Sequence, residues 1–295
     1  MKKNIVNRKF IENSTLVIIK SMSKIMIMRP DKKIFINKTA ILIMFMIMLN
    51  NLMFAQKTEF KKIENKAFKV GEVLRFDVKY GFVTAGIAEY SIPKITRLAG
   101  REVYNVSFNV NSVPAFDPFY KVRDHYETFI DVEGLFPWRF EQHIREGGYS
   151  RDFSAFFDQR KGVAKTSEGS YEIPPNVNDI VSAFYLARTF DYSKMKEGDK
   201  VHLENFYKDK TYPLDVVFKG KERISVAAGT FDCIILEPMV REGGLFKSDG
   251  SIVVWLTDDE LKIPVKVKTK VLIGSIDAEL SSYSGLAGKL SSKRD

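Results

Sequence analysis

A strict alternation of lysine and apolar residues in Lys262–Val271 limits what this chain can fold into. The even positions hold four lysines, Lys262, Lys266, Lys268 and Lys270. The odd positions hold the apolar residues Ile263, Val265, Val267 and Val271. Successive side chains of a β-strand point to opposite faces, so this period of two predicts one strand with a solvated lysine face. Contact of that face with anionic lipid or polymer is the alternative. The phase slips at Gly274, which predicts a bulge or a tight turn there.

The same alternation recurs along residues 56–295 and predicts an antiparallel β fold. The segment VLRFDVKY separates apolar from charged side chains, and FPWRFEQHI does so with Phe136, Trp138 and Phe140 on its apolar face. Gly147 and Gly148 then provide a turn into the next strand. About a dozen such strands follow one another without a break in composition. Residues 56–295 are therefore expected to form a single barrel-like domain.

One segment, NDIVSAFYLARTF, has the period of a helix instead. Its apolar residues recur at helical spacing: Ile180, Ala183, Phe184 and Ala187. Asn178 or Asp179 is available as the N-cap. Because the opposite side is also largely apolar, the helix is expected to be buried. We predict an all-β protein with a large antiparallel curved sheet, or a spiral or open β-barrel, around one buried central helix.

Positive charge is concentrated ahead of this β-rich part. Residues 1–55 contain ten Lys or Arg and two Asp or Glu, a balance of +8. Subtraction from the totals of 46 and 37 leaves 36 basic and 35 acidic residues, a balance of +1, for residues 56–295. A body so evenly charged argues against a nucleic-acid partner.

The basic segment predicts export from the cell. Lys32, Lys33 and Lys38 precede the apolar run Ala40–Leu49, and Ala55 follows as a cleavage position. Ten apolar helical residues cover only about 15 Å, about half of a hydrocarbon core. We therefore expect an N-terminal extension, a signal peptide over about residues 28–55, and no transmembrane span after cleavage.

Five segments, in order over about residues 66–282, together resemble a bacterial family catalogued as domain of unknown function 3108. They are FKVGEVLRFDVKYGFVTAG, FYKVRDHYETFID, NDIVSAFYLAR, ISVAAGTFDCIILEP and GLFKSDGSIVVWLTDDELKIPVKVKTKVLIGSIDAEL. The resemblance implies an exported protein of the periplasm or envelope of a Gram-negative bacterium, with a curved or spiral β-barrel around one helix. The family brings no established activity or catalytic residues, so none is assigned through it.

The sequence contains no motif that indicates a reaction. HExxH, GxSxG and P-loop patterns do not occur, and the chain has three histidines and one cysteine. A single cysteine cannot form a disulfide or a cysteine metal cluster within the chain, and Cys233 lies in an apolar run typical of a buried thiol. We expect a protein without catalytic activity, cofactor or metal. A hydrolase formed by Ser, His and Asp residues that converge in space is the alternative.

A ligand site is expected inside the barrel. In FYKVRDHYETFID, Asp124 shares a face with Tyr126 and with apolar residues, and a carboxylate there needs a partner. It is either a polar anchor in a ligand cavity or a structural ion pair with Arg145 or Arg151. The candidate ligand-binding residues are Asp124, Tyr126, Trp138, Phe140 and Phe184.

Aromatic residues make up 13% of the chain, and a wide barrel must either fill its interior with them or line a cavity. We expect an envelope protein that binds an apolar or amphipathic component, such as a lipid, or an envelope protein partner. A scaffold for envelope maintenance without a small ligand is the second hypothesis, and a hydrolase acting on an envelope substrate is the third.

Overall fold

The computed structural model describes residues 60–240, 252–271 and 274–294. Residues 59–295 form one compact unit. The expected N-terminal extension and signal peptide lie outside the described residues. The described part contains fifteen strands and one helix. In chain order they are β1 (Val73–Tyr80), β2 (Val83–Leu98), β3 (Arg101–Ser112), β4 (Arg123–Asp131), β5 (Pro137–Glu146), β6 (Tyr149–Asp158), β7 (Val163–Thr166), β8 (Gly169–Glu172), α3 (Ile180–Ala187), β9 (Lys200–Tyr207), β10 (Lys210–Val226), β11 (Gly229–Val240), β12 (Ile252–Thr257), β13 (Pro264–Lys270), β14 (Ser275–Ser284) and β15 (Lys293–Arg294).

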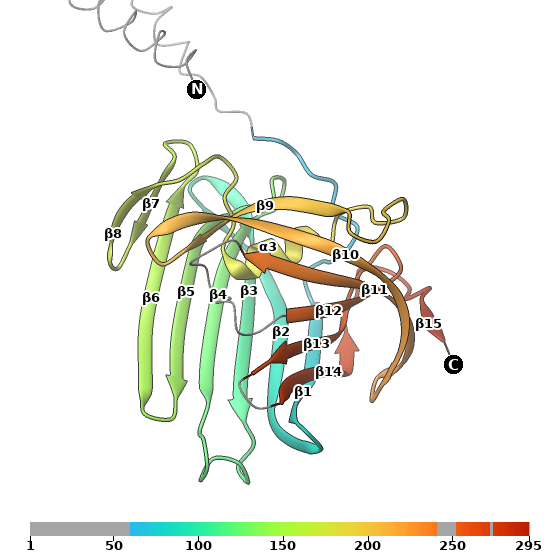
Figure 1. Cartoon of the computed structure of the whole chain (residues 1–295). Helices are drawn as coiled ribbons and strands as arrows, with labels where there is room; N and C mark the ends of the chain where they lie inside the picture. Colours follow the sequence, from blue (N-terminus) through green and yellow to red (C-terminus); the bar gives the residue numbers. More distant parts are fainter. Residues whose placement is uncertain (1–59, 241–251, 272–273, 295) are drawn as a thin grey trace, which may run out of the picture. The chain divides into compact units, whose positions relative to one another are not determined.

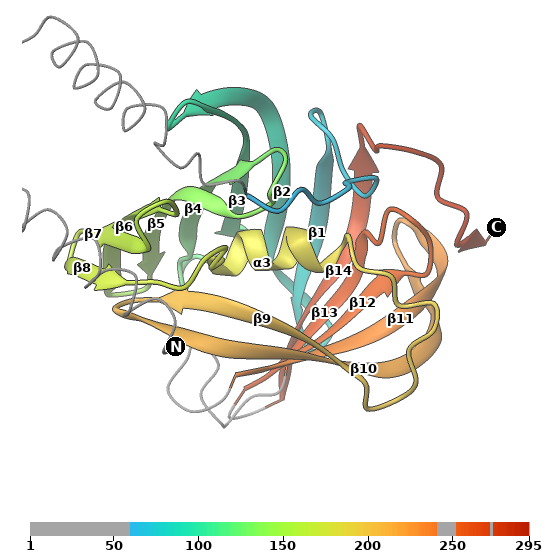
Figure 2. The same cartoon turned by 90° about the horizontal axis from the view of Figure 1, so that it is seen from above.

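The strands form a single antiparallel sheet that does not close. Its order is β8-β7-β6-β5-β4-β3-β2-β1-β14-β13-β12-β11-β10-β9, and β15 pairs with β11 off this path. The sheet therefore has two free ends, at β8 and β9. Figures 1 and 2 show it curling so that α3 lies between the layer of β2–β6 and the layer of β9 and β10. The predicted all-β class, with an open curved sheet around one helix, is confirmed.

Short turns set the register of this sheet. Between β2 and β3, Ala99 (φ 52°) and Gly100 (φ 77°) form a two-residue loop, and Leu98 pairs with Arg101. Two consecutive positive φ angles match the twist of a type I′ hairpin. The predicted turn at Gly147 and Gly148 likewise joins β5 to β6. Most connections are this local, so the topology follows directly from the order of the strands.

The N-terminus of α3 is tied to the inner face of β4. Asp179 is the N-cap: its Oδ1 accepts hydrogen bonds from the backbone N–H of Val181 and Ser182, and the Ser182 hydroxyl completes a capping box. The Thr128 hydroxyl of β4 donates to Asp179 Oδ2 over 2.6 Å. Burial raises the pKa of Asp179, while these hydrogen bonds oppose the rise. The helix thus begins at a fixed point on the sheet.

The C-terminus of α3 is held by a buried ion pair. Arg188 donates through both terminal nitrogens to Glu72, over 2.7 and 2.8 Å, and neither side chain is exposed. Arg188 also donates to the backbone carbonyls of Ala67 and Leu261, each over 3.1 Å from Nη2. One guanidinium therefore joins the helix to the segment before β1 and to the loop between β12 and β13.

The lysine-rich segment forms β13, with one correction at its start. The strand begins at Pro264, and Lys262 precedes it with a left-handed φ of 42°. Lys266 points away from the interior but is held by Asp277 and Glu279, over 2.9 and 2.8 Å. After the strand, the Val271 N–H donates to the Gly274 carbonyl, and Gly274 has φ 83°. The lysine face is thus the outer face of a strand, partly neutralised by β14.

Candidate functional site

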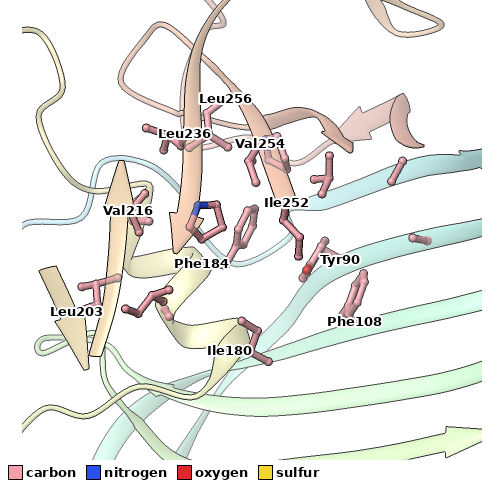
Figure 3. A pocket seen from close by; sticks show the side chains of 18 of the residues that line it. Tyr90, Phe108, Ile180, Phe184, Leu203, Val216, Leu236, Ile252, Val254 and Leu256 are labelled. Atoms are coloured by element: carbon pink, nitrogen blue, oxygen red, sulfur yellow. The ribbon is translucent and has the colours of Figure 1, made fainter. Parts of the chain in front are cut away.

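An apolar cavity of about 240 Å³ lies between α3 and the concave side of the sheet. Its wall combines four residues of the helix with side chains from both layers of strands. They are Ile180, Ala183, Phe184 and Ala187 of α3, with Phe76, Ala88, Tyr90, Phe108, Leu203, Leu214, Val216, Leu236, Pro238, Ile252, Val254, Leu256, Pro264, Val267 and Ala278. In Figure 3, Phe184 projects from α3 toward the strand that carries Ile252 and Val254. We call this space the first cavity.

A difference in packing between the two sides of α3 explains why the space stays open. Val181, Tyr185 and Leu186 are buried in the core on the far side of the helix. Ile180 and Phe184, on the cavity side, are only half-buried although they point into the protein. The predicted helix is therefore apolar on both sides, as expected, but only one side is filled by packing.

A second cavity of about 320 Å³ adjoins the first and is more polar. The two share four wall residues, and the second adds polar groups from β4, β5, β6 and the β9–β10 hairpin. Its wall consists of Tyr90, Phe108, Tyr126, Phe140, Gln142, Arg151, Phe153, Phe157, Ile180, Val181, Phe206, Tyr207, Lys208, Ile252 and Thr269. Strands near both free ends of the sheet contribute to it, so the second cavity lies where the barrel fails to close.

Tyr90 stands where the two cavities meet. Its ring is stacked on Phe108 at 4.0 Å and on Phe184 at 5.3 Å between centroids. Burial raises the pKa of its hydroxyl, so the group is neutral and able to donate a hydrogen bond at ordinary pH. In the described part of the chain, the hydroxyl has no hydrogen-bond partner. Tyr90 is not among the residues predicted above, although alternation in GIAEYSI places it on one face with Ala88 and Ile92.

Three of the five candidate residues line the cavities. Phe184 lines the first cavity, and Tyr126 and Phe140 line the second. Burial is the main reason that the pKa of Tyr126 is raised, to about 12. Tyr126 therefore stays protonated, and it offers a neutral hydroxyl to the second cavity.

Asp124 is buried on β4 but is not part of either cavity wall. Its Oδ1 accepts a hydrogen bond from the backbone N–H of Arg145 over 2.9 Å. The guanidinium of Arg145 bonds Asp152 instead, and that of Arg151 bonds Glu168. The ion pair expected with Arg145 or Arg151 is thus replaced by a backbone contact. Burial, followed by the charge of Asp124, raises the pKa of the neighbouring Glu146.

Trp138 lies apart from the cavities because a bulge interrupts the alternation of β5. Phe129 pairs with Arg139 and Ile130 pairs with Pro137, so Trp138 is the extra residue. Its ring joins a separate cluster with Val103 and Phe136, and its Nε1–H donates to Asp131 over 2.9 Å. Trp138 and Phe140 therefore do not share one environment, as uninterrupted alternation predicted. Trp138, like Asp124, lines neither cavity.

The two positive groups of the second cavity come from β6 and from the β9–β10 turn, near the two free ends of the sheet. Arg151 lies on the inner face of β6, with its guanidinium 5.1 Å from the centre of the Phe153 ring and 2.9 Å from Glu168. Lys208 lies in the β9–β10 turn and is exposed, with its Nζ 5.3 Å from the centre of the Tyr207 ring. Arg151, Lys208, Gln142 and Tyr126 all provide hydrogen-bond donors to the second cavity. In the wall of the first cavity, Tyr90 is the one residue with a polar side chain.

The histidines do not form a catalytic cluster in the described residues. His125 contacts Asn109 over 2.7 Å, His143 contacts Asp152 over 2.7 Å, and His202 contacts Asp215 over 2.9 Å. No Ser, Thr or Cys side chain of the described ranges bonds to any of them. Within the same ranges, no three His, Cys, Asp or Glu side chains are placed to hold a metal ion. Burial raises the pKa of the Cys233 thiol to about 12, as expected for an inert buried cysteine.

Comparison with known proteins places the chain in a family. The model of the family described as protein of unknown function DUF3108 matches residues 75–281. No curated protein matches the chain. In the described residues, no helix is long and apolar enough to cross a membrane.

Three crystal structures are similar in part. A β-barrel-like protein of domain of unknown function DUF1849 from Brucella abortus has a TM-score of 0.47 and 12% identity, covering 73% of this chain and 97% of its own. A Bacteroides fragilis protein described as exported, with a YmcC-like fold, has a TM-score of 0.31 and 12% identity, covering 77% and 100%. A Parabacteroides distasonis protein described as a lipoprotein has a TM-score of 0.30 and 11% identity, covering 77% and 100%.

Proposed function

The chain belongs to the DUF3108 family, whose function is unknown, so we propose a function from its two cavities alone. The protein binds an amphiphile that has a single alkyl chain. The apolar chain occupies the first cavity, and the polar head lies in the second. The protein acts as a binding protein rather than as an enzyme.

The first cavity is the observation that carries this proposal. Apart from the Tyr90 hydroxyl, its wall presents only aliphatic, aromatic and proline side chains. A polar ligand would lose its hydrogen bonds to water there without replacement, whereas an alkyl chain gains by leaving water. A scaffold without a ligand needs no such space, because its interior side chains would pack against one another.

The second cavity supports an amphiphile over a purely apolar ligand. Arg151 of β6 and Lys208 of the β9–β10 turn belong to its wall, and so do Tyr126 and Gln142. An anionic head, either carboxylate or phosphate, would find two cations and neutral donors at this position. The Tyr90 hydroxyl lies where the two cavities meet, between the positions proposed for the polar head and the alkyl chain of the ligand.

Charge removal tests this arrangement. For the variants Arg151→Gln and Lys208→Gln, we expect binding of palmitate or hexadecyl phosphate to weaken by about five- to tenfold each. Hexadecanol, which has the same chain and no charge, should bind them as it binds the natural protein. Lys210→Gln is the matched control, because Lys210 lies in the same hairpin over Tyr212 and outside both cavities. Equal affinity of all four proteins for palmitate would contradict the proposed head position.

We also propose that the protein is exported to the periplasm or envelope of a Gram-negative bacterium. The proposal rests on the basic and apolar segments at residues 32–55. The exported form should begin close to Gln56. Mass spectrometry of the protein isolated from the envelope checks this, and an intact N-terminus ahead of Ala40 would rule it out.

A further inference from the structure

Three turns meet the end of β13 and the start of β14 at one end of the sheet. In a meander, the β1–β2, β3–β4 and β5–β6 connections fall on the same side, and Tyr80 pairs with Ile276, which brings the start of β14 beside them. Backbone hydrogen bonds join neighbouring turns: Gly147 N–H donates to the Lys121 carbonyl over 2.8 Å, and Val113 N–H to the Ala85 carbonyl over 2.9 Å. The turns of β1–β6 at this end are at the bottom of Figure 1. We call this end the rim.

Exposed apolar side chains are concentrated on the rim. Of the ten large hydrophobic residues that the described part of the chain exposes, seven lie at the start of β14, in the three turns, or within two residues of those turns. They are Tyr80, Phe82, Val83, Phe119, Tyr120, Tyr149 and Ile276. Phe82 is fully exposed and Phe119 is 82% exposed. Both rings keep most of their apolar surface in water, although the Phe119 ring lies 6.1 Å from the Phe116 ring between centroids. Such a concentration of exposed apolar groups indicates a surface that becomes covered.

We propose that the rim binds the surface of a lipid bilayer by inserting these turn side chains. Five of the seven residues are Phe or Tyr, the ring types with an apolar body that suit the interfacial layer. They stand on separate turns rather than on one flat face. Separate projections fit a deformable lipid layer better than the rigid, closely packed core of a protein interface.

The charges of the rim fit a protein that is bound to the bilayer mainly by insertion of its apolar side chains. Lys121 and Lys270 are exposed at the same turns and can approach anionic head groups. Other charges are already paired at this end: Arg123 with Asp117 over 2.6 Å, and Lys79 with Glu279 over 2.7 Å. We therefore expect membrane binding that weakens only modestly in high salt.

Vesicle binding by the exported form tests the proposal. The double variant Phe82→Ser/Phe119→Ser should bind vesicles of phosphatidylethanolamine and phosphatidylglycerol more weakly, by about tenfold for each phenylalanine. The control is Val70→Ser/Ile95→Ser, which removes exposed apolar residues from the other end of the sheet and should leave binding unchanged. Co-sedimentation at 0.1 and 0.5 M salt measures the binding, and we expect a loss of less than about threefold between the two.

The result does not depend on whether the cavities hold a ligand, since the variants lie outside both cavity walls. Equal binding of the rim variant and the natural protein would overturn the proposal. So would failure of the natural protein to bind vesicles at either salt concentration, which would leave a protein partner as the occupant of the rim. Circular dichroism of both double variants confirms that the changes act on the folded protein.

Discussion

Arg188→Met is expected to destabilise the folded chain by about 3–5 kcal/mol, the cost of leaving a buried charge without its partner. The variant removes the guanidinium from Glu72, whose side chain is fully buried, and from the carbonyls of Ala67 and Leu261. Three segments lose their common contact at once: the C-terminus of α3, the residues before β1, and the loop before β13. Urea unfolding of the purified protein measures the change in free energy.

Two further variants separate the charge from the packing. Replacing both partners, in Glu72→Met/Arg188→Met, should cost less than Arg188→Met alone, because no buried charge is then left unpaired. Arg123→Met breaks a pair with Asp117 in which the arginine side chain is 37% exposed, and it should cost less than about 1 kcal/mol. If Arg188→Met and Arg123→Met cost the same, the ion pair does not hold the helix as described.

Ala278→Phe is expected to abolish binding of an alkyl chain, lowering affinity for hexadecanol or palmitate by at least about tenfold. Ala278 lies on β14 between Val78 and Val267, and it is part of the wall of the first cavity. A phenyl ring at this position would occupy the space that we assign to the alkyl chain of the ligand. Because the ring enters an existing space rather than a filled core, stability should change by less than about 1.5 kcal/mol.

The control for this variant is a phenylalanine outside the cavities. Ser154 is exposed on β6 opposite Glu141, so Ser154→Phe adds the same ring without narrowing either cavity. Binding measured by isothermal titration should be unchanged in Ser154→Phe and lost in Ala278→Phe. If Ala278→Phe binds these ligands as tightly as the natural protein does, their alkyl chain does not enter the first cavity.

The elements that depend on local sequence could be predicted. Period-two alternation identified β13 and its outer lysines, and an N-cap followed by helical spacing identified α3. Trp138 was misplaced because a β-bulge adds one residue, and the side-chain pattern of β5 contains no sign of it. Alternation is a reliable guide only where the pairing is uninterrupted.

The residues that line the cavities could be predicted only in part. Phe184, Tyr126 and Phe140 were expected from their faces, and Tyr90 could have been found by the same reasoning. The cavity-lining residues of β9–β12 could not be predicted from the sequence, because their place in the wall depends on how far the sheet curls before it ends. The pairing of Arg188 with Glu72 joins residues 116 positions apart, and no local pattern connects them.

The first cavity is expected to hold the alkyl chain of a bound ligand. The direct measurement is native mass spectrometry of the protein purified without detergent, followed by extraction and identification of what it releases. We predict a bound molecule with one alkyl chain and a carboxylate or phosphate head, present in the natural protein and in Ser154→Phe but missing from Ala278→Phe. Protein that carries no such molecule, and that binds neither palmitate nor hexadecanol when they are added, would contradict the account and favour a scaffold without a ligand.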